Sequence, residues 1–311
     1  MGYKKPMETT RTYLENAPLP NHGKSYTVVT HKSVIDNTLS LLRTSGFTVT
    51  EERYKCNVNA NVAQGIYYIR PNSTDTQVNN EEELGMMFAW TNSYDKSTRF
   101  QCSIGAYVKI CGNGMVAGDM YNFKRKHTGS ADLDIRNQLS NQIKNAEKYY
   151  KRLISDKELM KVIKLNCQQQ SELAGRLFIE EDMLDSQQMT CVKAEMDKPS
   201  FNYNCGDQTA WAFYNHVTHA LKKAHPRDWL ADQQNFHDFM TAECLNHTAL
   251  QFGKTDWKVN YDNTPLGITN ADDETCINTN IEVDTTVDMP QIEVDFDISP
   301  AKLKQDMFMG R

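Results

Sequence analysis

The chain has 311 residues and a mean hydropathy of −0.64, which is polar for a globular protein. Aromatic residues make up 10% of it, too many for a disordered chain, and its length suits one large domain or two ordinary ones. No apolar run approaches the roughly 20 residues that cross a bilayer, and the first ten residues lack the apolar stretch of a signal peptide. We therefore expect a cytoplasmic protein that is not bound to a membrane.

Charge is divided unevenly along the chain. Residues 261–311 carry eleven acidic and three basic side chains, a net of −8, whereas the whole chain carries −6, so residues 1–260 carry +2. We expect 261–311 to be a disordered acidic tail. Residues 262–311 would compete with a polyanion for the body or recruit a protein partner. A tail that serves only solubility is the alternative.

The N-terminal part is predicted to lead from irregular chain into a helix. Residues 1–25 are interrupted by proline and glycine, and 26–30 has the composition of a short strand. A helix is predicted over 31–45, with Thr30 or Ser33 as its N-cap and a glycine directly after it.

A sheet is predicted next. Strand-like stretches occupy 47–54, 62–70 and 84–91, with a polar loop at 71–83. The clearest strand is 99–111, where apolar residues at even positions alternate with mostly polar or small ones. This period of two predicts a strand with one buried face.

A turn and a change of period follow. Gly112-Asn113-Gly114 predicts a hairpin turn, because both residue types tolerate positive φ, and 115–123 would form the returning strand. Beyond it, apolar residues at spacings of three and four predict one long helix. These residues are Ile135, Leu139, Ile143, Ala146, Tyr150 and Leu153. Further helices are predicted over 171–184, 186–193, 210–224 and 228–251.

Together these elements predict an α+β protein, with an N-terminal antiparallel sheet and a helix followed by a mainly helical half. We expect an irregular segment at 1–25, a sheet region at 26–125, a helical region at 126–260 packed on it as one composite domain, and the acidic tail at 261–311.

Four blocks of sequence resemble a known family. They are Val28-Val29-Thr30-His31, Asn92 to Ser97, Val108 to Val116 followed by His127-Thr128-Gly129, and Trp211 to Thr218. Over roughly residues 25–250 the chain resembles the phage/plasmid-like protein family, a domain of unknown function common in bacteriophages and plasmids. That family usually has threonine where this chain has Gly112. The resemblance implies a mobile-element context in the cytoplasm of a bacterial host, and little about chemistry.

The most basic segment is 121–164, with eleven basic and five acidic side chains. Basic rows interleaved with aromatic rings suit a nucleic-acid backbone whose bases stack on the rings. A solvated helix face is the alternative. The predicted nucleic-acid-binding residues are Lys124, Arg125, Lys126, His127, Arg136, Lys144, Lys148, Arg152, Tyr121, Phe123 and Tyr149.

A metal site has weaker support. His216 and His219 share one face of a predicted helix at a spacing that zinc sites use, but His-Glu-x-x-His and Cys-x-x-Cys are absent. We therefore expect no metal or other cofactor, packed or surface histidines, and eight cysteines that remain thiols.

The sequence favours a non-enzymatic protein that binds single-stranded nucleic acid in replication or recombination, by strand binding or annealing. A counter-defence or host-takeover protein that binds a host protein is the first alternative. A metal-dependent nuclease or hydrolase using the His216–His219 region is the second. The choice between DNA and RNA and the formation of homo-oligomers stay open.

Overall fold

The computed structural model describes residues 7–20, 27–116 and 131–251. By its internal contacts the chain divides into two units, Met1–Leu266 and Gly267–Arg311, and everything described below belongs to the first. The predicted acidic tail therefore lies outside the described residues.

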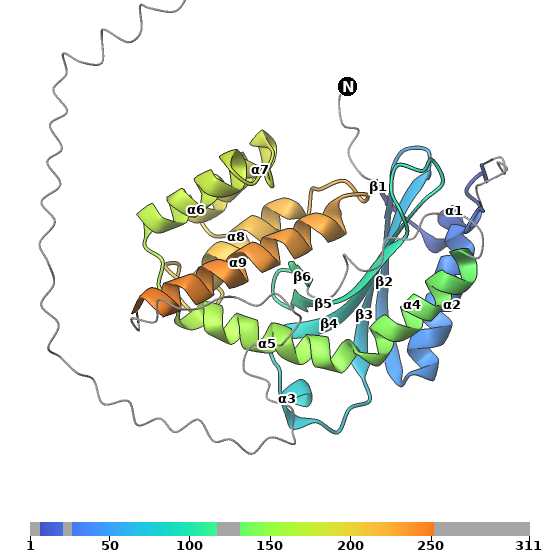
Figure 1. Ribbon diagram of the computed structural model, residues 1–311, viewed down its shortest axis with the longest axis horizontal. Helices are drawn as coiled ribbons and strands as arrows, with labels where there is room; N and C mark the ends of the chain where they lie inside the picture. Colours follow the sequence, from blue (N-terminus) through green and yellow to red (C-terminus); the bar gives the residue numbers. More distant parts are fainter. Residues whose placement is uncertain (1–6, 21–26, 117–130, 252–311) are drawn as a thin grey trace, which may run out of the picture. The chain divides into compact units, whose positions relative to one another are not determined.

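A six-stranded antiparallel sheet forms the N-terminal half, with its strands in sequence order (Figure 1). The α+β fold predicted from the sequence, a sheet followed by a helical half, is confirmed. The strands are β1 (Met7–Thr9), β2 (Phe47–Cys56), β3 (Val62–Pro71), β4 (Leu84–Ser93), β5 (Gln101–Val108) and β6 (Gly114–Val116).

The helices of the N-terminal half are α1 (Arg11–Glu15), α2 (His31–Thr44) and α3 (Thr76–Asn79). Thr30 caps α2 as predicted, because its side chain accepts a hydrogen bond from the Ser33 amide. The helical half contains α4 (Ala131–Lys144), α5 (Ala146–Val162), α6 (Cys167–Ile179), α7 (Ser186–Asp197), α8 (Ala210–Leu221) and α9 (Trp229–Gln251).

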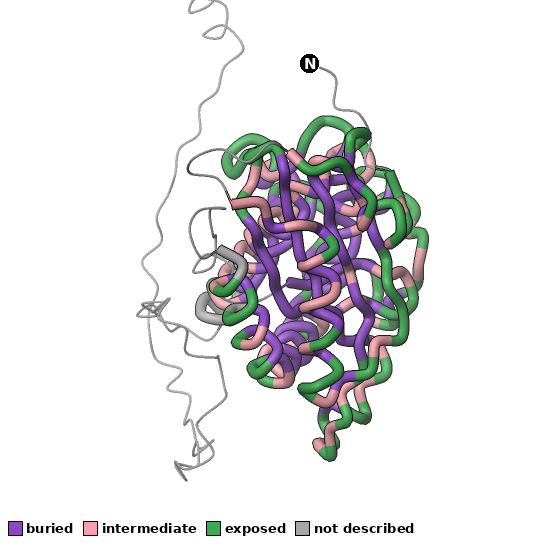
Figure 2. Tube along the Cα trace, turned by 90° about the vertical axis from the view of Figure 1, so that its right-hand side faces the viewer, coloured by how far each residue is buried: buried purple, intermediate pink, exposed green. Residues whose placement is uncertain are grey.

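The two faces of the sheet pack against different helices. On one face, side chains such as Phe88 and Trp90 join the main apolar core with α2, α4, α5 and α8. On the other face, Tyr68 and Met87 form a smaller apolar cluster with Trp229 at the start of α9. Buried residues thus run through the interior, and exposed ones follow the outer turns (Figure 2).

Three predictions for the N-terminal half are wrong. Residues 1–25 are not uniformly irregular, since they include β1 and α1, and the predicted loop 71–83 includes the short helix α3. Residues 27–30 form no strand, although 26–30 was predicted as one. β1 pairs with the outer edge of β2 instead, a long-range contact that three residues of local sequence cannot reveal.

Two further predictions need correction. β5 is buried on both faces, because α9 covers the face that the alternating pattern assigned to solvent. The long helix is two helices, α4 and α5, which meet at Asn145. All six apolar residues predicted for its inner face are buried nonetheless. Within 115–123, β6 ends at Val116, and the remainder lies outside the described residues.

Candidate nucleic-acid interface

The sequence blocks that carry the family resemblance meet in pairs. His31 stacks on the Tyr94 ring with centroids 3.9 Å apart, and its backbone amide donates to the Tyr94 hydroxyl at 2.7 Å. Asn92 donates to the Val29 carbonyl at 2.9 Å and lies 3.0 Å from His31 Nδ1, while His31 Nε2 lies 2.9 Å from the Ala60 carbonyl. Both ring nitrogens have partners inside the protein, so this cluster serves to join α2 to β4.

The other two blocks join the turn after β5 to α8. Asn113, which is fully buried, donates to the Asn215 carbonyl at 2.9 Å and to its side-chain oxygen at 3.1 Å. Asn215 in turn donates to the Trp211 carbonyl at 2.9 Å. Cys111 lies beside them, and burial raises the pKa of its thiol, which argues against a role as a nucleophile.

This turn forms one wall of a groove on the sheet, which we call the sheet groove. β2 and β3 form its floor, and Cys111, Gly112, Gly114, Lys222 and Trp229 line its other side. Its volume is about 670 Å³. The groove exists because α9 covers β4, β5 and β6 but leaves the central part of β2 exposed.

Two lysines in the sheet groove form no ion pair with any described residue, although Glu8, Glu51 and Glu52 also line the groove. Lys55 donates to the Lys222 carbonyl at 3.4 Å, and Lys222 donates to the Cys111 carbonyl at 2.5 Å. Within the described part of the chain neither ammonium group forms an ion pair, although Glu8 lies opposite Lys55 on β1. Burial lowers the pKa of both lysines, because it removes water from their charged ammonium groups. A bound anion would restabilise the charged form of each.

A planar cation lies next to these lysines. The Arg53 guanidinium stacks over the Tyr68 ring at 4.9 Å, and its Nε donates to Glu51 at 2.6 Å. Tyr68 packs on Tyr107 with ring centroids 4.2 Å apart. The Arg53 side chain keeps 54% of its surface exposed and lines the groove. Its guanidinium, fixed by Tyr68 and Glu51, is therefore a planar group that a ligand in the groove can reach.

The predicted basic row is divided between two helices. Arg136 and Lys144 belong to α4, whereas Lys148 and Arg152 follow Asn145 on α5. Arg136, Lys144 and Lys148 are exposed and form no ion pair with any described residue.

Arg152 and Tyr149 are partly withdrawn from solvent. Arg152 Nε is buried and lies 3.7 Å from Asp156, which also binds His237 at 3.0 Å. Tyr149 packs against the main core. The remaining predicted residues lie outside the described ranges: Tyr121, Phe123, Lys124, Arg125, Lys126 and His127.

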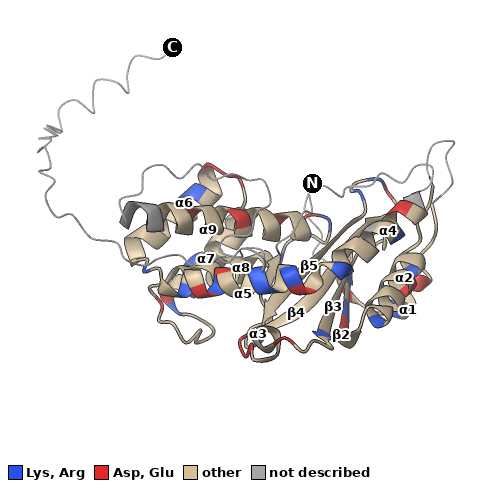
Figure 3. Cartoon of the chain, turned by 60° about the horizontal axis from the view of Figure 1, so that its bottom comes forward, with Lys and Arg blue, Asp and Glu red and all other residues tan. Residues whose placement is uncertain are grey.

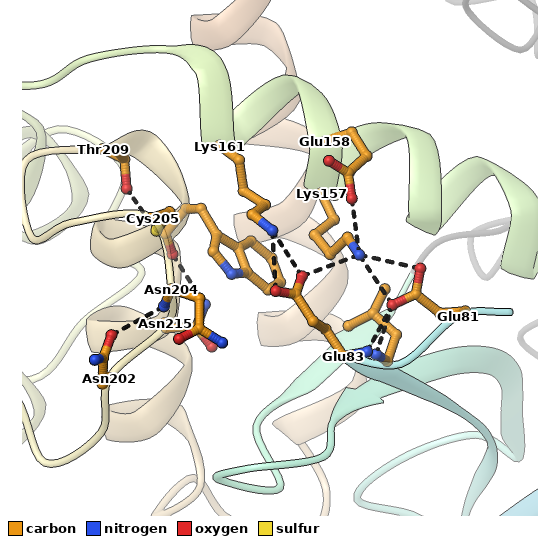
Figure 4. A network of polar contacts seen from close by, with 12 residues as sticks. Glu81, Glu83, Lys157, Glu158, Lys161, Asn202, Asn204, Cys205, Thr209 and Asn215 are labelled. Atoms are coloured by element: carbon orange, nitrogen blue, oxygen red, sulfur yellow. Dashed lines mark hydrogen bonds and ion pairs between the residues drawn. The ribbon is translucent and has the colours of Figure 1, made fainter.

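Acidic and basic positions are interspersed along α5 (Figure 3), and its other cations form ion pairs with nearby acids; two of these cations, Lys157 and Lys161, are drawn in Figure 4. Lys157 binds Glu81 at 2.9 Å, Glu83 at 3.1 Å and Glu158 at 2.9 Å, while Lys161 binds Glu83 at 2.9 Å. Burial lowers the pKa of Lys157, but these hydrogen bonds outweigh it and leave the pKa raised. The basic composition of 121–164 therefore overstates the charge that α5 offers to a ligand.

The two histidines of the candidate metal site, His216 and His219, belong to α8. His216 is buried and packs edge-on against Tyr203, and burial lowers its pKa. His219 lies 3.8 Å from Glu195. In the ranges described, no group of three or more metal-binding side chains is present. The seven cysteines in those ranges are free thiols.

A family model described as a domain of unknown function, DUF932, matches residues 18–248. The chain belongs to this family. The match agrees with the predicted resemblance to a domain of unknown function over roughly 25–250. No curated protein and no solved structure matches the chain. Among the described residues of this DUF932 chain, no helix has the length and apolar character needed to span a bilayer.

The sheet groove was missed by sequence reasoning. Lys55 belongs to a strand and Lys222 follows the last residue of α8, so no motif contains both. The only signal was indirect: the turn at Cys111–Gly114 and the helix before Lys222 are two of the family blocks. Their contact, which forms the wall of the groove, is a tertiary feature.

Proposed function

We propose that this chain is a non-enzymatic protein that binds single-stranded nucleic acid, encoded by a phage or plasmid and acting in the cytoplasm of its bacterial host. The observation that carries the proposal is the pair Lys55 and Lys222, which form no ion pair with any described residue and lie beside the Arg53 guanidinium in the sheet groove. Ammonium groups for phosphates next to a planar group for bases are the two elements that single-strand binding requires.

The exposed cations Arg136, Lys144 and Lys148 belong to α4 and α5, which pack against the other face of the sheet, and would serve as a second set of contacts to the backbone of a longer strand. They are solvated and without ion pairs in the described ranges, so each would release counterions when it meets a phosphate. The acidic residues 262–311 would compete with the same ligand, as the sequence predicts, or hold a protein partner.

Fluorescence anisotropy with single- and double-stranded DNA and RNA oligonucleotides at several salt concentrations tests the proposal. We expect single strands to bind with an affinity that falls steeply with salt, and residues 1–260 alone to bind more tightly than the full chain. The double variant Lys55→Ala/Lys222→Ala should bind several-fold more weakly, whereas Lys32→Ala, an exposed lysine on α2, should bind normally. Salt-independent binding, or none, would refute the proposal.

A further inference from the structure

The sheet groove contains a buried polar group without a partner. Gln64 on β3 is 1% exposed, lines the groove, and its Nε2 has no hydrogen-bond partner among the described residues. A buried amide left unpaired costs roughly 1–3 kcal/mol, so such groups are rare unless a ligand or water completes them.

The strand register places this amide beside Lys55. Gln64 is directly opposite Lys55 in the β2–β3 ladder, and Arg53 is opposite Ile66, one step along the same face. Directly opposite side chains in an antiparallel pair lie on one face of the sheet, with Cβ atoms about 4.5–5.5 Å apart. One face therefore presents a cation, an amide donor and a planar guanidinium within the span of two residue pairs, with Glu51, the ion-pair partner of Arg53, beside them.

The size of the groove fits one small ligand. Its volume of about 670 Å³ lies within the range of roughly 300–1,000 Å³ that holds drug-sized molecules. A nucleotide supplies a matching group for each feature: an anion for the lysines, a flat ring for Arg53, and carbonyl or ring-nitrogen acceptors for the Gln64 amide.

We propose that the sheet groove is a pocket for one nucleotide, with the phosphate between Lys55 and Lys222, the base on the Arg53 guanidinium, and the base edge at Gln64 Nε2. This inference rests on the proposed function, since it names the unit of the strand that the same groove holds. The unit is either a nucleotide within a strand or a free nucleoside monophosphate, which share this chemistry.

Calorimetric titration of the full-length chain with the nucleoside 5′-monophosphates, the corresponding nucleosides and inorganic phosphate tests the pocket. We expect one monophosphate per chain, bound at least about tenfold more tightly than inorganic phosphate or the nucleoside, because both ends of the ligand are held. The monophosphates should also displace a bound oligonucleotide.

The outcomes separate this inference from the proposed function. If oligonucleotides bind but monophosphates neither bind nor displace them, the pocket is refuted and the function stands. If monophosphates bind and oligonucleotides do not, the pocket stands and the function is refuted. If neither binds, both are wrong.

The variant Gln64→Leu tests the role of the amide. It should reduce the difference in affinity between bases about tenfold or more while affinity for inorganic phosphate stays unchanged. Its thermal stability should be unchanged or higher, because leucine has a similar size and lacks the unpaired buried amide.

Thr91→Val, on the neighbouring strand opposite Gln64, is the matched control. It removes a buried hydroxyl that donates to the Pro226 carbonyl within the protein, so it should not alter base preference. Equal base preference in wild type and Gln64→Leu would refute the assignment.

Discussion

Two pairs of lysines in this protein have opposite surroundings. Lys157 and Lys161 on α5 are bound by carboxylates, and the pKa of Lys157 is raised. Lys55 and Lys222 in the sheet groove donate only to backbone carbonyls, and the pKa of each is lowered by burial. The first pair has its anion within the fold, whereas the second pair forms no ion pair with any described residue.

The comparison shows what a count of charges misses. The segment 121–164 is the most basic part of the sequence, yet much of its charge on α5 is compensated by acids from the segment between β3 and β4. Lys55 and Lys222, which no basic segment contains, are partly buried and form no ion pair with any described residue. Availability for a ligand follows from tertiary pairing and not from local density of charge.

The largest effect is expected when Lys157, the more buried lysine of the α5 pair, is replaced. Lys157→Met leaves the carboxylates of Glu81 and Glu83 without their shared cation, and the Glu81 side chain is only 6% exposed. We expect a loss of about 3–5 kcal/mol in the free energy of unfolding, measured by urea denaturation. The control Glu158→Gln changes a partner that is 58% exposed and should cost about 1 kcal/mol or less. Equal losses in both variants would contradict this view of the network.

The matching change in the groove should affect binding and not folding. Lys55→Met/Lys222→Met removes two partly buried charges that lack an acidic partner, so the free energy of unfolding should stay equal or rise. Affinity for a single-stranded oligonucleotide should fall about tenfold or more, as measured by anisotropy. A large loss of stability with unchanged affinity would reverse the roles of the two pairs.

Chemical labelling sharpens the comparison without mutation. An amine-acylating reagent reacts with the uncharged amine, and a lowered pKa means that more of Lys55 and Lys222 is uncharged at pH 8–9. We expect both to be acylated well before the buried Lys157, as followed by peptide mass spectrometry, and to be protected by a bound oligonucleotide. The exposed Lys148 provides the reference for reagent access.

Of the two lysine pairs, only Lys157 and Lys161 should contribute to the loss of stability at low pH. Burial raises the pKa of Glu83, but its bonds to Lys161 and Lys157 outweigh this and leave the pKa below the ordinary value of 4.5. Its contribution is therefore fully present above that value and is lost as the pH falls through the folded-state pKa. Glu83→Gln should weaken the pH dependence of the melting temperature below pH 4.5, while Lys55→Met should not alter it.

The smallest effect is expected for the exposed row. Lys144→Ala/Lys148→Ala should change the free energy of unfolding by less than about 0.5 kcal/mol, because both side chains are solvated. It should lower the slope of log affinity against log salt by about one unit, as two single-strand phosphate contacts are lost. An unchanged slope would show that these lysines do not contact the nucleic acid, and the sheet groove would then be the remaining contact among the described residues.

Much of the fold is readable from local sequence. The helix after Thr30 is set by its cap and its apolar stripe, and the strands β2 to β5 are set by β-forming runs between polar turns. The burial of both faces of β5 cannot be read from local sequence, because small residues such as Ser103 and Gly105 suit a face covered by solvent as well as one covered by α9. The break at Asn145 cannot be read either, because the apolar spacing continues from α4 into α5.

The candidate site could not be predicted in the same way. Lys55 and Lys222 are separated by 167 positions along the sequence and meet only because the turn at Asn113 is bound to Asn215 on α8. Gln64 gave no signal either, since a single glutamine in a strand is ordinary until its burial and its missing partner are known. Both depend on which helix covers which strand.

The strand order carries a consequence for how the chain folds during synthesis. Each strand pairs with its neighbours in sequence, so the sheet can assemble as it leaves the ribosome, through contacts of low sequence separation. The bond between Asn113 and Asn215 spans 102 positions and cannot form until α8 has emerged. We therefore expect a nascent chain to hold a paired sheet whose groove still lacks its helical wall, so that the groove is among the last parts of this unit to form.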